Sequence, residues 1–426
     1  MTDIAAERPT RIRYLVLALL AFAAFSAYLT RTAISAAATT IERELALSHE
    51  QMGVVFAAFS TGYFWFQIPA GWIGTRRGRR ATLAAFGALW SLCAGLTAVA
   101  HSMTTLWLTR FGMGVTQAGL VPNAGKALDD WFPERNRGLA SAVLGSSMSA
   151  GAVLASGLTA VLLPVIGWRA VYALYAVQGI AWAMTFWFLF RDAPNRHPWV
   201  NRLEGELLQR PAPAGEQKRR LSLRSMACRG SLWANCGQSF FRAFGFAFFI
   251  TWFPAYLEKA HGVRVTSAGL LTMVPLVGVV AGSLAGGVLI DRLLRATGSK
   301  WVSRSLMAAA ALLLTATATL AASWADTPVS AVLVIGLGSV FLGASGPASW
   351  AATIDIGGQQ TALVFGIMNT VGVLGDLACP LAVGRLFSVI ERGGASWNSI
   401  LFLFAAVHAA GAVSWLLLNP NSTLED

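Results

Sequence analysis

Charged residues are scarce in this sequence. Asp, Glu, Lys and Arg make up 12% of the 426 residues, whereas 55% are hydrophobic. Soluble globular proteins contain about a quarter charged residues. So little charge excludes an ordinary soluble protein. The composition predicts a chain that crosses a lipid bilayer many times and has little mass outside it.

Residues suited to metal binding or covalent catalysis are also few. The four cysteines show neither the short spacing of a metal site nor an obvious disulfide pairing, and they are Cys93, Cys228, Cys236 and Cys379. The five histidines do not cluster. No nucleophile with a neighbouring base lies in the apolar segments. We therefore expect no metal, no cofactor and no enzymatic activity.

Long apolar segments occupy most of the sequence. An α-helix needs about 20 apolar residues to cross a bilayer, and windows of that length recur along the chain. They predict an all-α membrane protein with twelve transmembrane helices, at residues 13–38, 51–73, 81–100, 104–127, 138–165, 170–190, 232–257, 266–290, 303–323, 328–351, 361–388 and 397–418.

The longest polar gap, residues 191–230, separates six of these predicted helices from the other six. It contains Pro, Gly, Ala and charged residues with little apolar periodicity, which is typical of a linker that has room for a short amphipathic helix. We therefore expect an N-terminal six-helix half at 1–190, a cytoplasmic linker at 191–230 and a C-terminal six-helix half at 231–426.

The net charge of +12 is unevenly distributed. Twenty-three of the 32 Lys and Arg residues lie in the tail and loops on the side of the two chain ends, and six lie in the opposite loops. Positively charged loops stay in the cytoplasm, so a multi-pass topology with both termini cytoplasmic is predicted. Because topology accounts for the charge, we expect the lipid bilayer as a partner and no nucleic acid.

The two halves carry similar loop sequences. "GWIGTRRGRR" at 71–80 follows the second predicted helix, and "GGVLIDRLLRATG" at 286–298 follows the eighth. Parallel repeats of this kind enclose a substrate site near the bilayer midplane in many transporters. The arrangement resembles the major facilitator superfamily, whose loop pattern is a Gly, a small turn, an Asp and then basic residues around a Gly. Thr75 stands at the Asp position of the first loop, whereas Asp291 and Arg292 keep the pattern in the second.

This resemblance implies that the two loops act as conformational switches. The residues that match the pattern are Gly71, Arg76, Gly78, Arg79, Asp291 and Arg292. A basic cluster such as "RRGRR" also suits nucleic acid or lipid headgroups, but the switch interpretation fits its position between two predicted helices better.

A narrower resemblance extends along nearly the whole chain. Its longest segment is "RFGMGVTQAGLVPNAGKALDDWFPERNRGLASAV" at 110–143, and shorter ones are "TRTAIS", "GYFWFQIPAGW", "ITWFPAYL" and "GIMNTVG". Together they resemble the anion:cation symporters, which include hexuronate, galactonate and phthalate transporters and the vesicular glutamate and sialic-acid carriers. The resemblance implies a secondary transporter of small organic anions that works by alternating access in a bacterial inner membrane.

Three arginines lie inside predicted helices: Arg31, Arg110 and Arg242. A charged side chain at membrane depth is costly, and no acidic residue neighbours Arg31 or Arg110 in the sequence. A guanidinium matches a carboxylate or phosphate with two parallel hydrogen bonds, so an anionic substrate would stabilise these residues. The alternative is a structural arginine that extends to the membrane surface or forms an ion pair.

The resemblance assigns the substrate carboxylate to Arg31 and Arg110. Arg242 lies twelve residues before Pro254, a spacing at which the vesicular glutamate carriers also have an arginine, and it is a candidate for a second acidic group. Three cations favour a substrate with two or more negative charges, such as a dicarboxylate, or a sugar acid or phosphonate.

The sequence departs from the family at the acids that carry protons in similar symporters. Thr30 and Gln117 occupy those two positions, and neither can carry a proton, although Gln117 lies two turns after Arg110 and can bind substrate. One acid remains deep in a predicted helix, Asp376. It is a candidate coupling site for a proton or sodium ion, or a fixed counter-ion for Arg242, or a purely structural residue.

Other candidates for substrate binding are Tyr63 and Gln67, one turn apart on the second predicted helix, and Asn369 on the eleventh. Polar residues also join helices to one another in membranes, and that alternative is equally well supported. The resemblance favours proton-coupled transport by a monomer. Anion exchange, sodium coupling and export stay open, and a non-transporting sensor is a further alternative.

Overall fold

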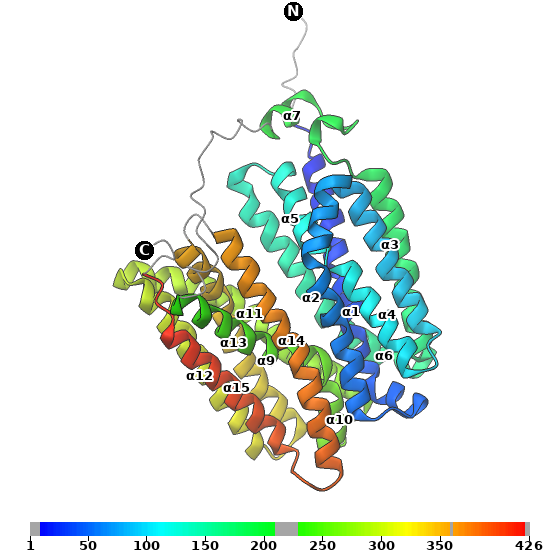
Figure 1. The fold of residues 1–426 in the computed structure, drawn as a ribbon, viewed down its shortest axis with the longest axis vertical. Helices are drawn as coiled ribbons and strands as arrows, with labels where there is room; N and C mark the ends of the chain where they lie inside the picture. Colours follow the sequence, from blue (N-terminus) through cyan, green and yellow to red (C-terminus); the bar gives the residue numbers. More distant parts are fainter. Residues whose placement is uncertain (1–8, 209–228, 358–360, 422–426) are drawn as a thin grey trace, which may run out of the picture. The chain divides into compact units, whose positions relative to one another are not determined.

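The computed structural model describes residues 9–208, 229–357 and 361–421. Every regular element in these residues is a helix, as Figure 1 shows. The first part contains α1 (Ile12–Leu45), α2 (His49–Arg77), α3 (Arg79–Ala98), α4 (Met103–Gln117), α5 (Leu120–Trp131), α6 (Glu134–Leu189), η1 (Pro194–Arg196) and α7 (Arg202–Leu208). The all-α class predicted from the apolar segments is confirmed.

The second part begins after the linker. It contains α9 (Gly230–Thr251), α10 (Phe253–His261), α11 (Val265–Thr297), η2 (Val302–Leu306), α12 (Met307–Ala321), η3 (Ala322–Trp324), α13 (Pro328–Gly357), α14 (Thr361–Glu391) and α15 (Asn398–Leu417). Each of the twelve predicted spans falls on helical residues. Within the described ranges, eight helices are long and apolar enough to cross a membrane, or nine if α9 and α10 form one bent span.

Four of the predicted spans differ from simple, separate helices. The predicted helices at 138–165 and 170–190 are parts of α6, which breaks at Gly167, where φ is +74°. A glycine tolerates this left-handed conformation without strain. The predicted helix at 232–257 bends by 63° between α9 and α10, where Pro254 lacks the N–H that a continuous helix needs. The predicted helix at 104–127 is divided into α4 and α5.

Contacts between residues divide the chain into two units. Unit 1 comprises Met1–Arg31, Thr61–Ala152 and Ile166–Glu216, and unit 2 comprises Thr32–Ser60, Val153–Val165 and Gln217–Asp426. One end of the α1–α2 pair and a short middle segment of α6 therefore belong to unit 2. The predicted halves at 1–190 and 231–426, with their linker, stay a prediction.

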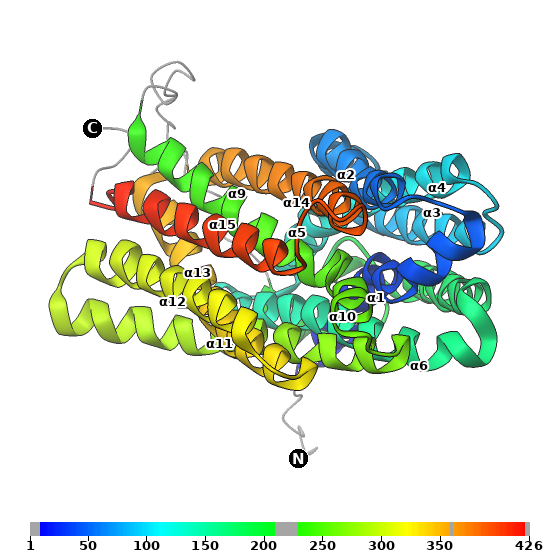
Figure 2. The ribbon, with the colours of Figure 1, turned by 90° about the horizontal axis from the view of Figure 1, so that it is seen from below.

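Close helix packing builds the core of each unit. In unit 1, a Cβ at Gly62 of α2 would lie 2.3 Å from the Phe111 carbonyl oxygen of α4, so only a glycine allows this approach. In unit 2, α11 and α12 both pack on α13 (Figure 2). Gly282 and Gly286, one turn apart on α11, face the backbone of α13 with no room for a Cβ. Small residues at such spacing bring helix backbones together in membranes.

The described part of the linker packs against the first helix. α7 lies beside the start of α1 (Figure 1), and its Glu204 is fully buried. Glu204 accepts hydrogen bonds from the Thr10 hydroxyl at 2.6 Å and from the backbone N–H groups of Ile12 and Arg13 at 3.1 and 3.2 Å. A carboxylate at a helix N-terminus satisfies amides that have no partner within the helix. The rest of the linker, residues 209–228 with Cys228, lies outside the described residues.

We expect Glu204→Gln to destabilise the protein. Hydrogen bonds to a charged group contribute about 1.5–3 kcal/mol each, and the variant loses the charge and one acceptor oxygen. A loss of about 1–3 kcal/mol, seen as a lower melting temperature of the detergent-purified protein, is expected. Glu206→Gln is the matched control, because Glu206 is exposed and pairs with Arg202 one turn away. Equal melting temperatures of the two variants would show that Glu204 does not support α1.

Candidate functional site

Arg110 of α4 is buried in unit 1 beside α1. Its side chain is 3% exposed, and its Nη2 donates a hydrogen bond of 3.0 Å to the backbone oxygen of Arg31. The Arg31 guanidinium lies over the Tyr28 ring, 5.5 Å from its centroid. The two arginines lie close enough to interact electrostatically. The structure therefore brings together the two cations that the sequence singled out.

Gln117, two helical turns after Arg110, also joins α4 to α1. It is buried, and its Nε2 lies 3.2 Å from both the Ala27 carbonyl oxygen and the Thr30 hydroxyl oxygen. Thr30 in turn donates to carbonyl oxygens of its own helix. The two positions at which similar symporters have acids are therefore in contact here, as a neutral hydrogen-bonded pair.

Tyr172 is a residue of this site that the sequence analysis did not identify. It lies on α6 after the Gly167 break and is fully buried. It is close enough to interact electrostatically with Arg110, and its hydroxyl has no hydrogen-bond partner among the described residues. A tyrosine in an apolar helix gives little signal by itself, since it packs as readily as it binds.

Arg242 of α9 and Asp376 of α14 lie near each other in unit 2. They interact electrostatically, and both are half-buried. α14 approaches α9 closely at Gly375, next to Asp376, because glycine has no Cβ. A Cβ there would lie 2.2 Å from the Phe240 carbonyl oxygen. Proximity to Arg242 suits Asp376 both as a fixed counter-ion and as a coupling site.

The other candidates for substrate binding are less buried than Arg110 and Gln117. Tyr63 and Gln67 are half-buried on α2, and Asn369 is exposed on α14. Gln238, one turn before Arg242, is fully buried, and its Nε2 donates to Asn235 at 2.9 Å and to Ser349 at 2.8 Å. Gln238 therefore joins α9 to α13, as polar residues do between membrane helices.

The predicted switch loop of the first half connects α2 to α3 through Gly78, where φ is +85°. Arg79 forms an ion pair of 2.6 Å with Asp130 of α5, and its Nη2 donates to the Asp192 carbonyl oxygen after α6. Arg76 is exposed and lies over the Trp72 ring. Gly71 faces Pro122 of α5 at an ordinary contact distance. The loop thus links the ends of four helices in unit 1.

The corresponding region of the second half has ion pairs at residues that the sequence analysis did not name. Asp291 and Arg292 are both exposed. Asp355 at the end of α13 instead pairs with Lys300 at 2.9 Å and with Arg304 at 3.2 Å. Arg304–Asp355 connects the start of the ninth predicted span to the end of the tenth, as Arg79–Asp130 connects the start of the third to the end of the fourth. Sequence spacing alone did not reveal this second pair.

Comparison with known proteins identifies the family. Residues 20–380 match the model of the Major Facilitator Superfamily. The chain belongs to the major facilitator superfamily.

Several relatives of this superfamily member are named for the anions they carry. A probable sulfoacetate transporter, SauU, of Cupriavidus necator is 29% identical over 97% of this chain and 96% of its own length. A probable L-galactonate transporter of Escherichia coli is 28% identical over 97% and 91%. A probable galactarate/D-glucarate transporter, GudP, of Bacillus subtilis is 27% identical over 97% and 93%. These relatives confirm the resemblance to the anion:cation symporters.

A solved structure shares the fold. The crystal structure of a bacterial homologue of the human lysosomal transporter Spinster superposes with a TM-score of 0.77 at 19% identity, over 96% of this chain and 95% of that one. The family and the relatives are transporters, so this superfamily member is a multi-pass membrane transporter and not an enzyme. Within residues 9–208, 229–357 and 361–421, no group of His, Cys, Asp and Glu is arranged to hold a metal ion.

A double-mutant cycle tests the Gln117–Thr30 contact. Gln117→Met and Thr30→Val should each lower stability slightly, and the double variant should lose less than the sum. Hydrogen bonds between membrane helices contribute about 0.6 kcal/mol on average, with a maximum near 1.7, so a coupling of that size is expected. SDS-induced unfolding in mixed micelles measures it, with Gln67→Met on α2 as the control. Strictly additive effects would mean that the two side chains do not interact.

Proposed function

We propose that this protein is a secondary transporter of small organic anions in a bacterial inner membrane. The observation that carries the proposal is the pairing of Arg31 with Arg110. Two guanidinium groups that lie close together within membrane helices repel each other, and burial increases the cost. An anion bound by both would relieve the repulsion. The two side chains therefore form a natural site for one acidic group.

The names of the relatives support an anionic substrate. They refer to sulfoacetate, galactonate and galactarate or glucarate, all small acids, and two of these classes have two acidic groups. We propose that Arg31 and Arg110 bind one acidic group. Arg242 stays, as in the sequence analysis, a separate candidate for an acidic group. Tyr172 contributes a hydroxyl donor to the same anion, because its buried O–H has no other acceptor among the described residues.

Coupling to protons is our first proposal for the energy source, and Asp376 is the candidate group. Anion exchange is the second candidate, and one observation favours it: Thr30 and Gln117 form a neutral pair at the positions of the usual proton-carrying acids. Sodium coupling and export are less well supported. We further propose a cofactor-free monomer with both termini in the cytoplasm, because the basic loops lie on that side.

Substrate binding is tested by thermal unfolding of the purified protein with monocarboxylates, dicarboxylates, sulfonated acids and sugar acids. A ligand at 100 times its Kd stabilises the folded state by about 2.7 kcal/mol, so a dianion should raise the melting temperature by several degrees. Arg110→Ala should fold but lose this shift.

The matched control is Arg264→Ala, because Arg264 is exposed at the start of α11. An equal shift in the Arg110→Ala variant would remove the arginine pair from the site. Stabilisation by neutral or cationic compounds alone would overturn the anion-carrier proposal.

Coupling is tested in proteoliposomes with the anion found above. Wild-type protein should accumulate it under an inward proton gradient, and Asp376→Asn should abolish this accumulation while sparing exchange in preloaded vesicles. Asp326→Asn, which changes an exposed loop acid, is the control. Unchanged accumulation in Asp376→Asn would exclude this residue from coupling. Wild-type exchange without accumulation would select the exchanger.

A further inference from the structure

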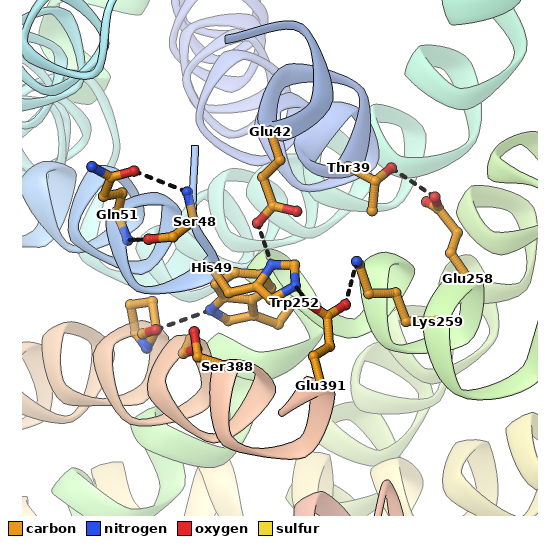
Figure 3. A network of polar contacts seen from close by, with 12 residues as sticks. Thr39, Glu42, Ser48, His49, Gln51, Trp252, Glu258, Lys259, Ser388 and Glu391 are labelled. Atoms are coloured by element: carbon orange, nitrogen blue, oxygen red, sulfur yellow. Dashed lines mark hydrogen bonds and ion pairs between the residues drawn. The ribbon is translucent and has the colours of Figure 1, made fainter. Parts of the chain in front are cut away.

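A polar cavity lies where one end of α1 and α2 meets α10 and α14, all within unit 2. Its volume is about 740 Å³, and Figure 3 shows the side chains around it. Glu42 comes from α1, His49 from α2, Lys259 from α10 and Glu391 from α14. These residues lie just outside the predicted membrane spans, at the end of the helices opposite the loops proposed to be cytoplasmic. None of them belongs to the proposed substrate site.

His49 is held by two carboxylates at once. Its Nδ1 lies 2.8 Å from Glu42 Oε1, and its Nε2 lies 2.8 Å from Glu391 Oε2. The imidazole is 7% exposed. Figure 3 shows the ring between the two acids, with Lys259 on the far side of Glu391. The His49 side chain therefore connects α1 to α14.

The chemistry of this contact requires a proton. A neutral imidazole has one N–H donor and one nitrogen that only accepts, whereas an ionised carboxylate only accepts. A neutral His49 could therefore bond to one of the two acids and would present a lone pair to the other. Only the imidazolium donates to both, and each of these bonds is then charge-assisted.

We propose that His49 is a proton-binding site whose protonated form holds the ends of α1 and α2 against α14, and that loss of the proton opens this end of the transporter. The ligand is a proton from the extracytoplasmic solution. This proposal goes beyond the proposed function and requires no particular substrate.

The charges around His49 support this assignment. Burial lowers the pKa of His49, but the hydrogen bonds to Glu42 and Glu391 and the charge of Glu42 outweigh it, so the pKa is raised above 6.5 although Lys259 opposes the rise. The charged residues near the cavity on all four helices are Glu42 and Arg43 on α1, Glu50 on α2, Glu258 and Lys259 on α10, and Glu391 and Arg392 on α14.

The sign of the pH effect follows from the raised pKa. A group that binds its proton more tightly in the closed arrangement stabilises that arrangement at low pH. The stabilisation is complete below the ordinary histidine value of 6.5 and is lost as the pH rises through the raised pKa of His49. Acid outside therefore favours closure of this end, and alkaline solution favours its opening.

The neighbouring contacts explain why one proton can have a large effect. A Cβ at Gly53 of α2 would lie 2.5 Å from the Pro380 carbonyl oxygen, and a Cβ at Gly384 of α14 would lie 2.6 Å from the His49 carbonyl oxygen. The two backbones thus touch with few side chains between them. Besides the ion pairs, the Trp252 and Phe387 rings pack edge-on against His49 at 6.1 and 5.6 Å.

Other polar contacts complete the same end of unit 2. Thr39 of α1 donates to Glu258 of α10 at 2.6 Å, and Lys259 donates to Glu391 at 2.6 Å. Glu391 therefore contacts two cations, Lys259 and the protonated His49. When His49 loses its proton, Glu42 loses the positive charge of the imidazolium. Glu391 loses it too but keeps its ion pair with Lys259. We therefore expect the ends of α1 and α2 to separate from α14, while α10 stays joined to α14 through Lys259 and Glu391.

Histidine NMR of the full-length protein in detergent, without substrate, tests the protonation state. The chain has five histidines, and His49→Gln identifies the signal of His49. At pH 6 this signal should show protons on both ring nitrogens, and its titration midpoint should lie above 6.5. Glu42→Gln and Glu391→Gln should each move the midpoint down. Glu50→Gln, which removes a half-exposed carboxylate one residue away, should not.

A single-tautomer, neutral His49 at pH 6 would overturn the proposal, as would a midpoint that neither Glu42→Gln nor Glu391→Gln changes. These outcomes are independent of any anion, so they are distinct from a failure of the proposed function.

Opening is measured by labelling a cysteine at Ser388, which is buried beside the cavity. In Ser388→Cys, a membrane-impermeant maleimide applied to whole cells should react several-fold faster at pH 8.5 than at pH 6. These rates are corrected for the pH dependence measured on an exposed control, Ser396→Cys. In the same background, His49→Gln should react at a corrected rate that does not change with pH. A pH-dependent rate that survives His49→Gln would overturn the proposal.

Discussion

The cost of placing charge inside a membrane governs the rest of this structure. Each deep charge in the described residues has a defined neighbour: Arg110 donates to the backbone of Arg31, and Arg242 lies near Asp376. The helices around them approach through glycines and small residues, so that few side chains are available to shield these groups. The charges are therefore concentrated in a few places, and those places contain the candidate site residues.

Much of the fold was predictable because the bilayer imposes a simple length rule. All twelve predicted spans fall on helices, and the short helix expected in the linker is α7. The break at Gly167 and the bend before Pro254 were less accessible, because apolar residues continue on both sides of each. The predicted switch residues of the second half, Asp291 and Arg292, are exposed, whereas the ion pairs of that loop use Asp355. The acid that pairs with a basic loop lies at the end of another helix, and sequence spacing does not show which helix ends lie next to that loop.

The candidate site was predictable in its charges and not in its neutral partners. Arg31, Arg110 and Gln117 stood out because polar residues are conspicuous in apolar segments, and they lie together. Tyr172 was missed because a tyrosine suits an apolar helix with or without a ligand. His49 was missed for another reason. Its partner Glu391 lies on α14, more than 300 positions away, and Glu42 lies on a different helix from His49. No periodic pattern within one helix connects these residues.

The capping of α1 by Glu204 has a consequence for biosynthesis. The acceptor for the first amides of α1 is encoded nearly two hundred residues downstream. While the ribosome makes the first six predicted spans, the start of α1 must rely on water or lipid headgroups for these bonds. The first helix to enter the membrane thus completes the hydrogen bonds of its N-terminal turn only after the linker has been made. The start of α1 therefore reaches its final structure later than the helices that follow it.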